Sequence, residues 1–183
     1  MNEIKIGNRK IGEKYPIFVI AEAGINHNGS LIIAKKLVNM AKKAGADCIK
    51  FQTHIVEEEM TQTKILPGKI SKTPLWDIIK NCQLTVNEEK KLNEYCKKKK
   101  ILFLSTPFSI SAVNRLEKIK IPAYKIGSGE LTNIPFLKHI AKKKKPVILS
   151  TSSGSAEEKT SFIPDQQTFP RHIAHIRPLV TNL

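Results

Sequence analysis

Two lysines stand inside short apolar segments that are typical of β-strands. Lys50 lies in Cys-Ile-Lys-Phe-Gln (48–52), and Lys125 lies in Ala-Tyr-Lys-Ile-Gly (123–127). A lysine inside a strand loses hydration when it is buried, so each needs a nearby anion or a carboxylate such as Glu22 to compensate. The pair therefore predicts a buried site for a small anionic ligand.

Further polar side chains stand where each expected strand ends, which is where βα barrels carry their chemistry. The Gly-Ser-Gly at 127–129 can present backbone N–H groups to a phosphate, although by itself such a turn is more simply structural. Short hydroxyl and amide donors suit the same anion. The candidate residues are Glu22, Gln52, Ser105, Thr106, Ser128, Glu130, Ser150 and Thr151.

Strands and helices are expected to alternate along the chain, as in a βα-repeat fold. Ser30 is suited to cap the first helix, and Thr85 with Glu88 is suited to form a capping box for a later one. A long excursion, residues 53–84, separates the second strand from the third. The expected strands are residues 16–22, 47–52, 101–106, 123–126 and 146–150.

The faces of these strands distinguish between two βα folds. Strands of an open doubly wound sheet are covered on both faces and should be apolar throughout. Here Lys50 and Gln52 share one face while Ile49 and Phe51 share the other, so one face is polar, as in a ligand-lined barrel interior. We therefore predict an α/β protein of the (β/α)8 TIM-barrel type. A closed barrel has eight βα units in about 250 residues, and about five units are visible here, so an incomplete barrel is expected.

The βα pattern fails after Thr151. A small-residue stretch gives way to a mixed polar segment that contains three prolines, with neither a clear strand nor a long amphipathic helix. We divide the chain into a barrel part, residues 1–151, and a divergent tail without stable order, residues 152–183. His172 and His175 lie in this tail, and without a third ligand nearby their spacing is attributed to chance.

Composition limits the class of protein. The net charge of +15 comes mostly from lysine runs such as 97–100 and 142–145, which are typical of solvated turns, and arginine is too scarce to favour a nucleic-acid partner. No apolar run approaches the roughly 20 residues of a membrane helix. Three widely spaced cysteines favour neither disulfides nor a zinc site. A cytoplasmic protein with no membrane or nucleic-acid partner is expected.

Six motifs, taken in order and spacing, closely resemble the N-acetylneuraminate (sialic acid) synthase family, which also includes legionaminic and pseudaminic acid synthases. The resemblance runs from about Pro16 to Thr151. The motifs are Ala-Glu-Ala-Gly-Ile-Asn-His-Asn-Gly (21–29), Ile-Lys-Phe-Gln (49–52), Thr-His-Ile-Val-Glu-Glu-Glu-Met (53–60), Ser-Thr-Pro-Phe (105–108), Tyr-Lys-Ile-Gly-Ser-Gly-Glu (124–130) and Leu-Ser-Thr (149–151).

The resemblance implies a transferase that condenses phosphoenolpyruvate with N-acetylmannosamine or a related amino sugar, giving an N-acetylneuraminate-type nonulosonic acid and phosphate. It implies that Glu22 and Glu130 face the reacting carbons as catalytic residues. It also implies a substrate-binding set for phosphoenolpyruvate and the sugar, made of Lys50, Gln52, Thr106, Lys125, Ser128, Ser150 and Thr151.

The resemblance further implies a domain-swapped homodimer and a divalent metal, Mn²⁺ or Mg²⁺. The two histidines that bind this metal in the family belong to later strands, so no metal ligand is assigned here. In the family's Ser-Thr-Gly-Met motif, Ser152 and Ser153 replace the glycine and the methionine here. Lys69 replaces the asparagine that usually follows Pro-Gly in the excursion. We therefore expect a truncated chain with impaired activity.

Alternatives remain beside this interpretation. The chain is alternatively a non-catalytic fragment that binds anions or pairs with a complete synthase subunit, or a ketodeoxyoctonate-type synthase, although the motifs at 26–29 and 124–130 argue against the latter. His27 is expected to tie its loop to its own backbone. Residues 57–59, three consecutive glutamates, are interpreted as a solvated acidic surface.

Overall fold

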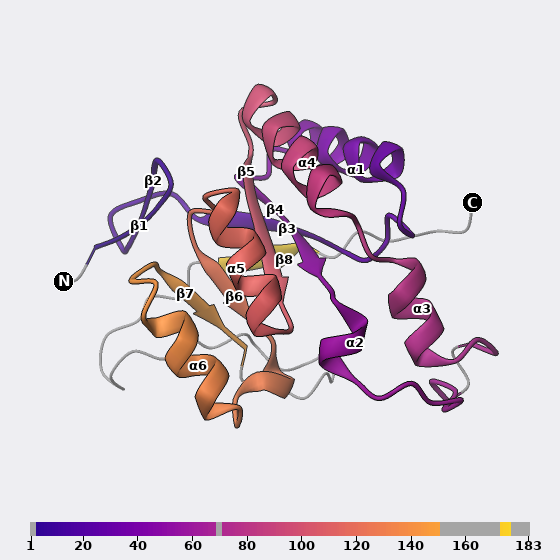
Figure 1. Cartoon of the computed structure of the whole chain (residues 1–183). Coiled ribbons are helices and arrows are strands. Elements are labelled where there is room, and N and C mark those ends of the chain that lie inside the picture. The colour runs from indigo at the N-terminus through magenta and orange to yellow at the C-terminus, as the bar shows by residue number, and fades with distance from the viewer. Residues whose placement is uncertain (1–2, 69–70, 151–172, 177–183) are drawn as a thin grey trace.

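The computed structural model describes residues 3–68, 71–150 and 173–176 of the chain (Figure 1). Three long strands, β3 (Phe18–Gly24), β4 (Cys48–Thr53) and β5 (Leu102–Pro107), pair in parallel. Two short strands, β6 (Tyr124–Ile126) and β7 (Val147–Leu149), form a second parallel pair, and β6 lies against β5. The five strands predicted from the sequence are therefore confirmed, with bounds that differ by one or two residues.

Helices follow the strands and cover their outer side. They are α1 (Leu31–Lys43), α4 (Val86–Lys98), α5 (Ile110–Lys118) and α6 (Ile134–Ala141). The capping box of α4 is present, because Thr85 Oγ1 accepts from the Glu88 backbone N–H while the Glu88 carboxylate accepts from the Thr85 N–H. The side chain of Ser30 likewise accepts from the Ile33 N–H at the start of α1. These caps satisfy donors that a helix start leaves free.

The excursion between β4 and α4 carries two short helices, α2 (Val56–Glu59) and α3 (Leu75–Asn81), which an ion pair between Glu57 and Lys80 connects. The loop after β3 packs closely against the end of α3. Gly29 has a φ of +74°, and a Cβ on it would lie 2.3 Å from the Asn81 carbonyl oxygen. Only glycine fits this approach.

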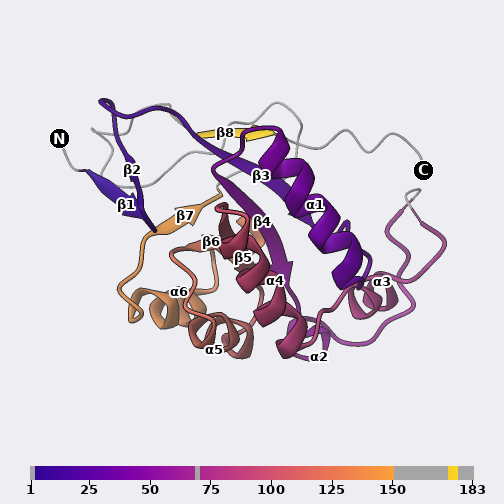
Figure 2. The same ribbon diagram turned by 90° about the horizontal axis from the view of Figure 1, so that it is seen from above.

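Two apolar clusters lie on opposite sides of the strands. The outer cluster, which includes Ile49, Phe51 and Phe103, fills the space between strands and helices. The inner cluster is smaller and lies among Ile20, Cys48, Leu104, Ala123 and Ile148. An antiparallel hairpin, β1 (Ile4–Ile6) and β2 (Arg9–Ile11), adds Ile4, Ile6 and Ile11 to the inner cluster. Figure 2 shows this hairpin at the end of the strands away from α2 and α3.

A further strand, β8 (Ile173–Ile176), pairs in parallel with β3, with Phe18 opposite Ile173 and Ala21 opposite Ile176. No strand is expected from the sequence in the tail, so that expectation is wrong for these four residues. The edge of β3 offers unpaired backbone groups, and a short segment with isoleucine at both ends can pair with them despite its weak sequence pattern. The rest of the predicted tail, 152–172 and 177–183, lies outside the described residues.

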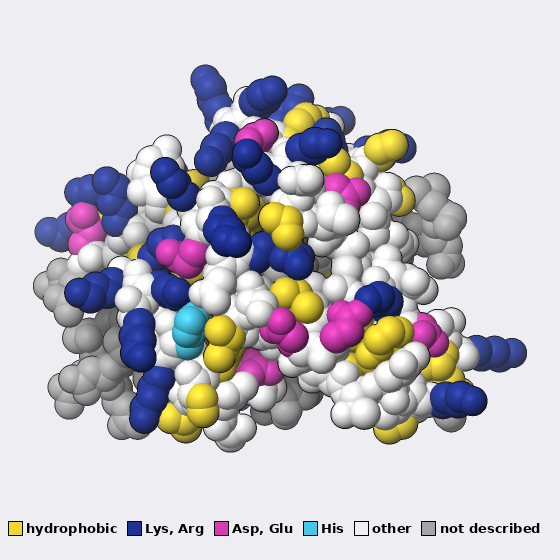
Figure 3. Space-filling model, in the orientation of Figure 1, with side chains coloured by type: hydrophobic (Ala, Val, Ile, Leu, Met, Phe, Trp, Pro, Cys, Tyr) yellow, Lys and Arg dark blue, Asp and Glu magenta, His cyan; other side chains and the backbone are white. Residues whose placement is uncertain are grey.

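The surface agrees with the interpretation of the lysine run 97–100 as solvated. Lysine and arginine side chains gather over α1 and α4 and around α6 (Figure 3). All four residues of the run 97–100 are exposed.

Within the described ranges, no helix has the length and apolar character needed to cross a membrane.

Candidate active site

Lys50, on β4, projects to the inner side of the strands and is 4% exposed. It forms an ion pair with Glu22 of the neighbouring strand β3, and its Nζ lies 3.5 Å from Thr106 Oγ1 on β5. Glu22 also accepts, through Oε1, a hydrogen bond of 3.1 Å from the Gly24 N–H. The predicted compensation of Lys50 by Glu22 is therefore confirmed, and three adjacent strands contribute to one polar cluster.

Lys125, on β6, is equally buried and lies on the corresponding side of the second strand pair. Its Nζ donates to the Ile126 carbonyl oxygen at 2.9 Å and to Ser150 Oγ. Loss of hydration, and then repulsion by the charge of Lys50, lower the pKa of Lys125 to about 8, against a smaller opposing effect of Glu22. The two lysines thus share one electrostatic environment although they lie on different strands.

The charges of this site do not balance. Glu22 pairs with Lys50, but within the described residues no carboxylate forms an ion pair with Lys125. Two buried ammonium groups therefore face one carboxylate. An added anion relieves the repulsion between them, because it supplies negative charge where water has been excluded.

Gln52 follows Lys50 on the same face of β4 and is held by a histidine. His54 Nε2 lies 2.9 Å from Gln52 Oε1, and His54 Nδ1 lies 2.7 Å from Glu59 Oε2. The Glu59 side chain is 6% exposed, so the interpretation of 57–59 as a solvated surface is wrong for this residue. Glu59 turns inward because it also accepts from the Ile55 N–H at 2.6 Å, which closes the first turn of α2.

Glu130 has a hydrogen-bond partner of its own, separate from the two lysines. It ends the short 3-10 turn η1 (Ser128–Glu130) after β6, and its Oε2 accepts a hydrogen bond of 2.8 Å from Asn133 Nδ2. Asn133 in turn caps α6. Glu130 is therefore placed at the start of a helix, in a position that also suits a structural role. Thr151 lies outside the described residues.

His27 is completely buried, with its Nδ1 accepting from the Gly29 N–H at 3.2 Å. Burial, and then the neighbouring His54, lower its pKa. This confirms the expectation that His27 ties its loop to its own backbone. Sequence reasoning missed the His54–Glu59 contact; the signal that could have found it is a histidine five residues before a glutamate, at the start of a helix.

Known proteins match the part of the chain that carries these residues. The model of the NeuB family matches residues 37–164, which extends past Thr151, where the motif resemblance ends. An N,N'-diacetyllegionaminic acid synthase of Campylobacter jejuni is 40% identical over 145 residues, covering 76% of this chain and 43% of that protein. Human N-acetylneuraminate-9-phosphate synthase is 32% identical over 154 residues, covering 81% and 43%.

A solved structure shows the likeness in three dimensions. The N-acetylneuraminic acid (sialic acid) synthetase of Leptospira borgpetersenii, in complex with citrate, superposes with a TM-score of 0.75 at 37% identity, covering 85% of this chain and 51% of that one. A truncated 3-deoxy-D-arabino-heptulosonate 7-phosphate synthase of Thermotoga maritima, 13% identical with a TM-score of 0.56, shares the fold. The chain spans about half the length of these proteins.

Proposed function

The chain belongs to the NeuB family, and on that basis we propose that it is the phosphoenolpyruvate-binding part of a nonulosonic acid synthase. The observation that carries this proposal is the buried pair Lys50 and Lys125, which faces one carboxylate at the carboxyl ends of parallel strands. Phosphoenolpyruvate carries a phosphate and a carboxylate, so it supplies the missing negative charge. The proposed acceptor is N-acetylmannosamine or a related amino sugar.

In the proposed reaction, carbon 3 of phosphoenolpyruvate attacks the aldehyde carbon of the open-chain sugar, and a carbon–carbon bond forms. Water then adds to carbon 2, and one of its protons goes to the alkoxide formed from the aldehyde oxygen. The bond between carbon 2 and the phosphate oxygen breaks, the new carbon 2 hydroxyl gives its proton to the leaving phosphate, and a keto acid and hydrogen phosphate result. The chemistry needs a held anion, a positioned water and proton transfer.

Residue roles follow from the site. Lys50 and Lys125 hold the phosphate and carboxylate, because fixed ammonium groups in a dry site stabilise the charge that moves to the leaving phosphate. The hydroxyl groups of Thr106, Ser128, Ser150 and Thr151 and the amide of Gln52 complete the proposed binding set. Glu22 and Glu130 are proposed to position water or sugar hydroxyls and to move protons.

We infer that the described strands β3 to β7 are the first five of a (β/α)8 barrel. The charged groups at the carboxyl ends of the inner face, opposite an apolar outer face, support this inference, as does the place of the N-terminal hairpin at the amino ends of the strands. The remaining strands and the partner subunit of a domain-swapped homodimer are needed to complete the site. Activity of this chain by itself is therefore expected to be impaired.

In the complete site, we propose, a divalent metal would supply polarisation of the sugar aldehyde. Within residues 3–68 and 71–150, no group of three or more histidine, cysteine, aspartate or glutamate side chains is placed to hold such an ion. The described residues therefore do not fit a metal by themselves.

A second candidate function is an anion-binding, non-catalytic fragment that pairs with a complete synthase subunit. The position of Glu130 favours it, because this carboxylate accepts a hydrogen bond from Asn133 and, among the described residues, forms no ion pair with Lys50 or Lys125. The two candidates share the anion site and differ in turnover.

The test combines binding with turnover. Phosphoenolpyruvate binding is measured by calorimetry, and phosphate release is measured with N-acetylmannosamine, with and without Mn²⁺. We expect binding that the double variant Lys50→Ala, Lys125→Ala loses and the exposed control Lys118→Ala retains. Turnover that the double variant loses supports the first candidate, whereas binding without turnover is compatible with both. Equal binding by the double variant would refute the anion site itself.

A further inference from the structure

A buried histidine controls the orientation of one proposed substrate-binding side chain. His54 is 6% exposed and contacts three groups: Gln52 Oε1 through Nε2, Glu59 through Nδ1, and the ring of Phe108. The two rings are stacked, with centroids 4.5 Å apart and an angle of 10° between their planes. Within the described part of the chain, His54 is thus fixed by hydrogen bonds at both nitrogens and by packing on one face.

The hydrogen-bond chemistry decides which nitrogen carries hydrogen. A carboxylate only accepts, and Glu59 Oε1 is already bound to the Ile55 N–H, so Glu59 Oε2 must accept from His54 Nδ1. A carbonyl oxygen also only accepts, so the 2.9 Å contact between Gln52 Oε1 and His54 Nε2 is satisfied by a hydrogen on that nitrogen.

We propose that His54 is a positioning residue that turns the Gln52 amide so that its NH₂ group faces bound substrate as a donor. This inference rests on the proposed function, in which Gln52 belongs to the binding set. With Oε1 held by His54, the amide nitrogen is the end that remains for substrate oxygens. Without His54, the amide can rotate and present its oxygen, which repels the oxygens of an anion or a sugar hydroxyl lone pair.

The support of His54 extends across the site. Phe108 follows β5, and a Cβ on Gly127 would lie 3.6 Å from Phe108 Cε1, so this ring lies between His54 and the turn after β6. The stacked pair therefore connects the strand that carries Gln52 and Lys50 with the turn that carries Ser128. A rigid support of this kind keeps a binding side chain in one orientation.

A double-mutant cycle tests the inference. His54→Phe keeps a ring against Phe108 and removes both hydrogen bonds, while Gln52→Ala removes the amide. The probes are phosphoenolpyruvate, and N-acetylmannosamine in the presence of phosphoenolpyruvate, with dissociation constants from calorimetry. We expect each single variant to weaken the same probe by about 3- to 10-fold, the effect of one hydrogen bond. The double variant should be no weaker than Gln52→Ala alone.

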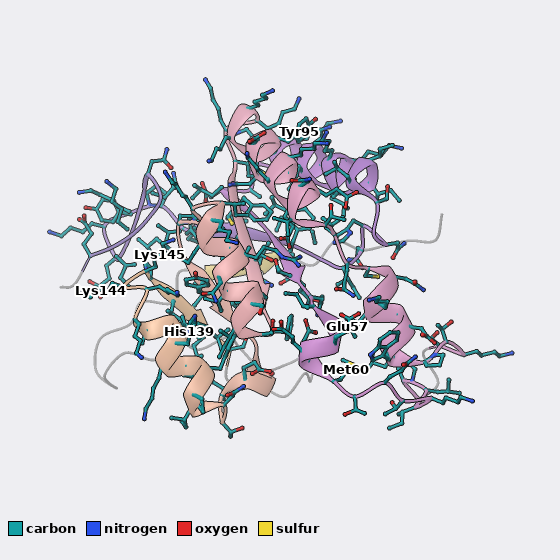
Figure 4. All side chains as sticks on the ribbon, in the orientation of Figure 1. Glu57, Met60, Tyr95, His139, Lys144 and Lys145 are labelled. Carbon is teal, nitrogen blue, oxygen red and sulfur yellow. The ribbon has the colours of Figure 1, made fainter. Side chains whose placement is uncertain are left out.

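Additive losses in the double variant, or a loss on Gln52→Ala that His54→Phe does not share, would overturn the proposal. His139→Phe is the matched control, because His139 lies on α6. Figure 4 shows His139 away from Glu57 of α2. If both lysine variants lose binding while the Gln52 and His54 variants keep it, this inference fails and the proposed function stands. If wild-type protein binds neither probe, both fail.

Variants of Glu59 separate positioning from simple packing. In Glu59→Gln the amide oxygen can accept from the Ile55 N–H and the amide nitrogen can donate to His54 Nδ1, which leaves the hydrogen on Nε2 and the bond to Gln52. Glu59→Leu provides neither. We expect Glu59→Gln to lose less affinity than Glu59→Leu, and ¹⁵N NMR to show a protonated Nε2 in wild-type protein. A bare Nε2 would refute the proposal even in a stable, folded protein.

Discussion

Along one inner face of the strands, the amino ends are apolar and the carboxyl ends are charged. Ile20 and Cys48 are completely buried at the amino ends, whereas Glu22 and Lys50 stand two residues further along β3 and β4. Lys125 follows Ala123 in the same way. A side-chain period of two places both kinds of residue on one side of the sheet, so position along the strand, and not the face, separates them.

The two ends contribute opposite terms to stability. The amino ends are closed by the N-terminal hairpin and gain from removing apolar surface from water. The carboxyl ends bury two ammonium groups that lose hydration and repel each other. The amino ends thus stabilise the fold, whereas the carboxyl ends destabilise it and serve ligand binding, a division that βα barrels commonly show. Substitutions at each end should then have opposite effects.

The largest effect is expected from Ile20→Ala, in the apolar end. Ile20 is fully buried in the inner cluster with the hairpin residue Ile6, so truncation leaves a cavity and should destabilise the fold by about 2–5 kcal/mol. Urea unfolding measures this loss, with Ile32→Ala as the control because Ile32 is 72% exposed. An Ile20→Ala protein as stable as wild type would contradict the apolar role of this end.

The second prediction concerns the charged end and has the opposite sign. Lys125→Met keeps the length of the side chain and removes its buried charge, so the unbound chain should become more stable by about 1–3 kcal/mol at pH 7. Phosphoenolpyruvate binding should be lost in the same protein. Unfolding and calorimetry measure both, with the exposed Lys118→Met as the control. A destabilised Lys125→Met that still binds would erase the difference between the two ends.

The third prediction is a pH dependence of the charged end. Burial, and then Lys50, hold the pKa of Lys125 at about 8, below its value of 10.5 in the unfolded chain. Between these values the unfolded state binds more protons, so stability of the unbound chain should rise with pH by about 1 kcal/mol per unit. Phosphoenolpyruvate affinity should fall over the same range, because Lys125 loses its charge while the phosphate stays ionised.

Lys125→Met controls this experiment, because it lacks the titrating group. Wild type is expected to be less stable than the variant at pH 8. Urea unfolding between pH 8 and 10 should show that this difference in the free energy of unfolding shrinks toward zero as pH rises. A flat wild-type profile, with affinity unchanged above pH 8, would show that Lys125 keeps an ordinary pKa and that the two lysines do not share one environment.

The contrast between the two ends was readable from the sequence, because it depends on local patterns. Alternation in 48–52 and 123–127 assigned Lys50 and Lys125 to the polar face, and the capping residues fixed the helix starts. These features depend on neighbours within a few residues. The structure confirmed them with small shifts in the bounds of the strands.

Two features were missed, and only the second of them depends on residues far apart in the sequence. The inward turn of Glu59 requires the Ile55 N–H and the buried ring of His54, and a run of three glutamates reads as solvated without that information. The pairing of β8 with β3 depends on an edge far away in sequence.

The smallest effect is expected from Glu89, a buried charge at the carboxyl ends but on the outer, helix side. Glu89 lies on α4 and is 4% exposed, with Arg115 Nη1 3.6 Å from its Oε2. Burial raises the pKa of Glu89 to about 7, against the opposing effects of Thr53 and Arg115. The folded state then binds more protons than the unfolded state between about pH 4.5 and 7, so this group lowers stability as pH rises.

Glu89→Gln should therefore stabilise the chain by about 1 kcal/mol at pH 8, since the removed cost of burial is partly offset by leaving Arg115 without its partner. At pH 5, where Glu89 is protonated, the variant and wild type should be equally stable, and phosphoenolpyruvate affinity should not change at either pH. Urea unfolding at the two pH values measures the difference. If the variant is less stable at pH 8, the ion pair with Arg115 outweighs the cost of burying Glu89. The buried charge on the outer side would then stabilise the fold, whereas the buried charge of Lys125 on the inner side destabilises it.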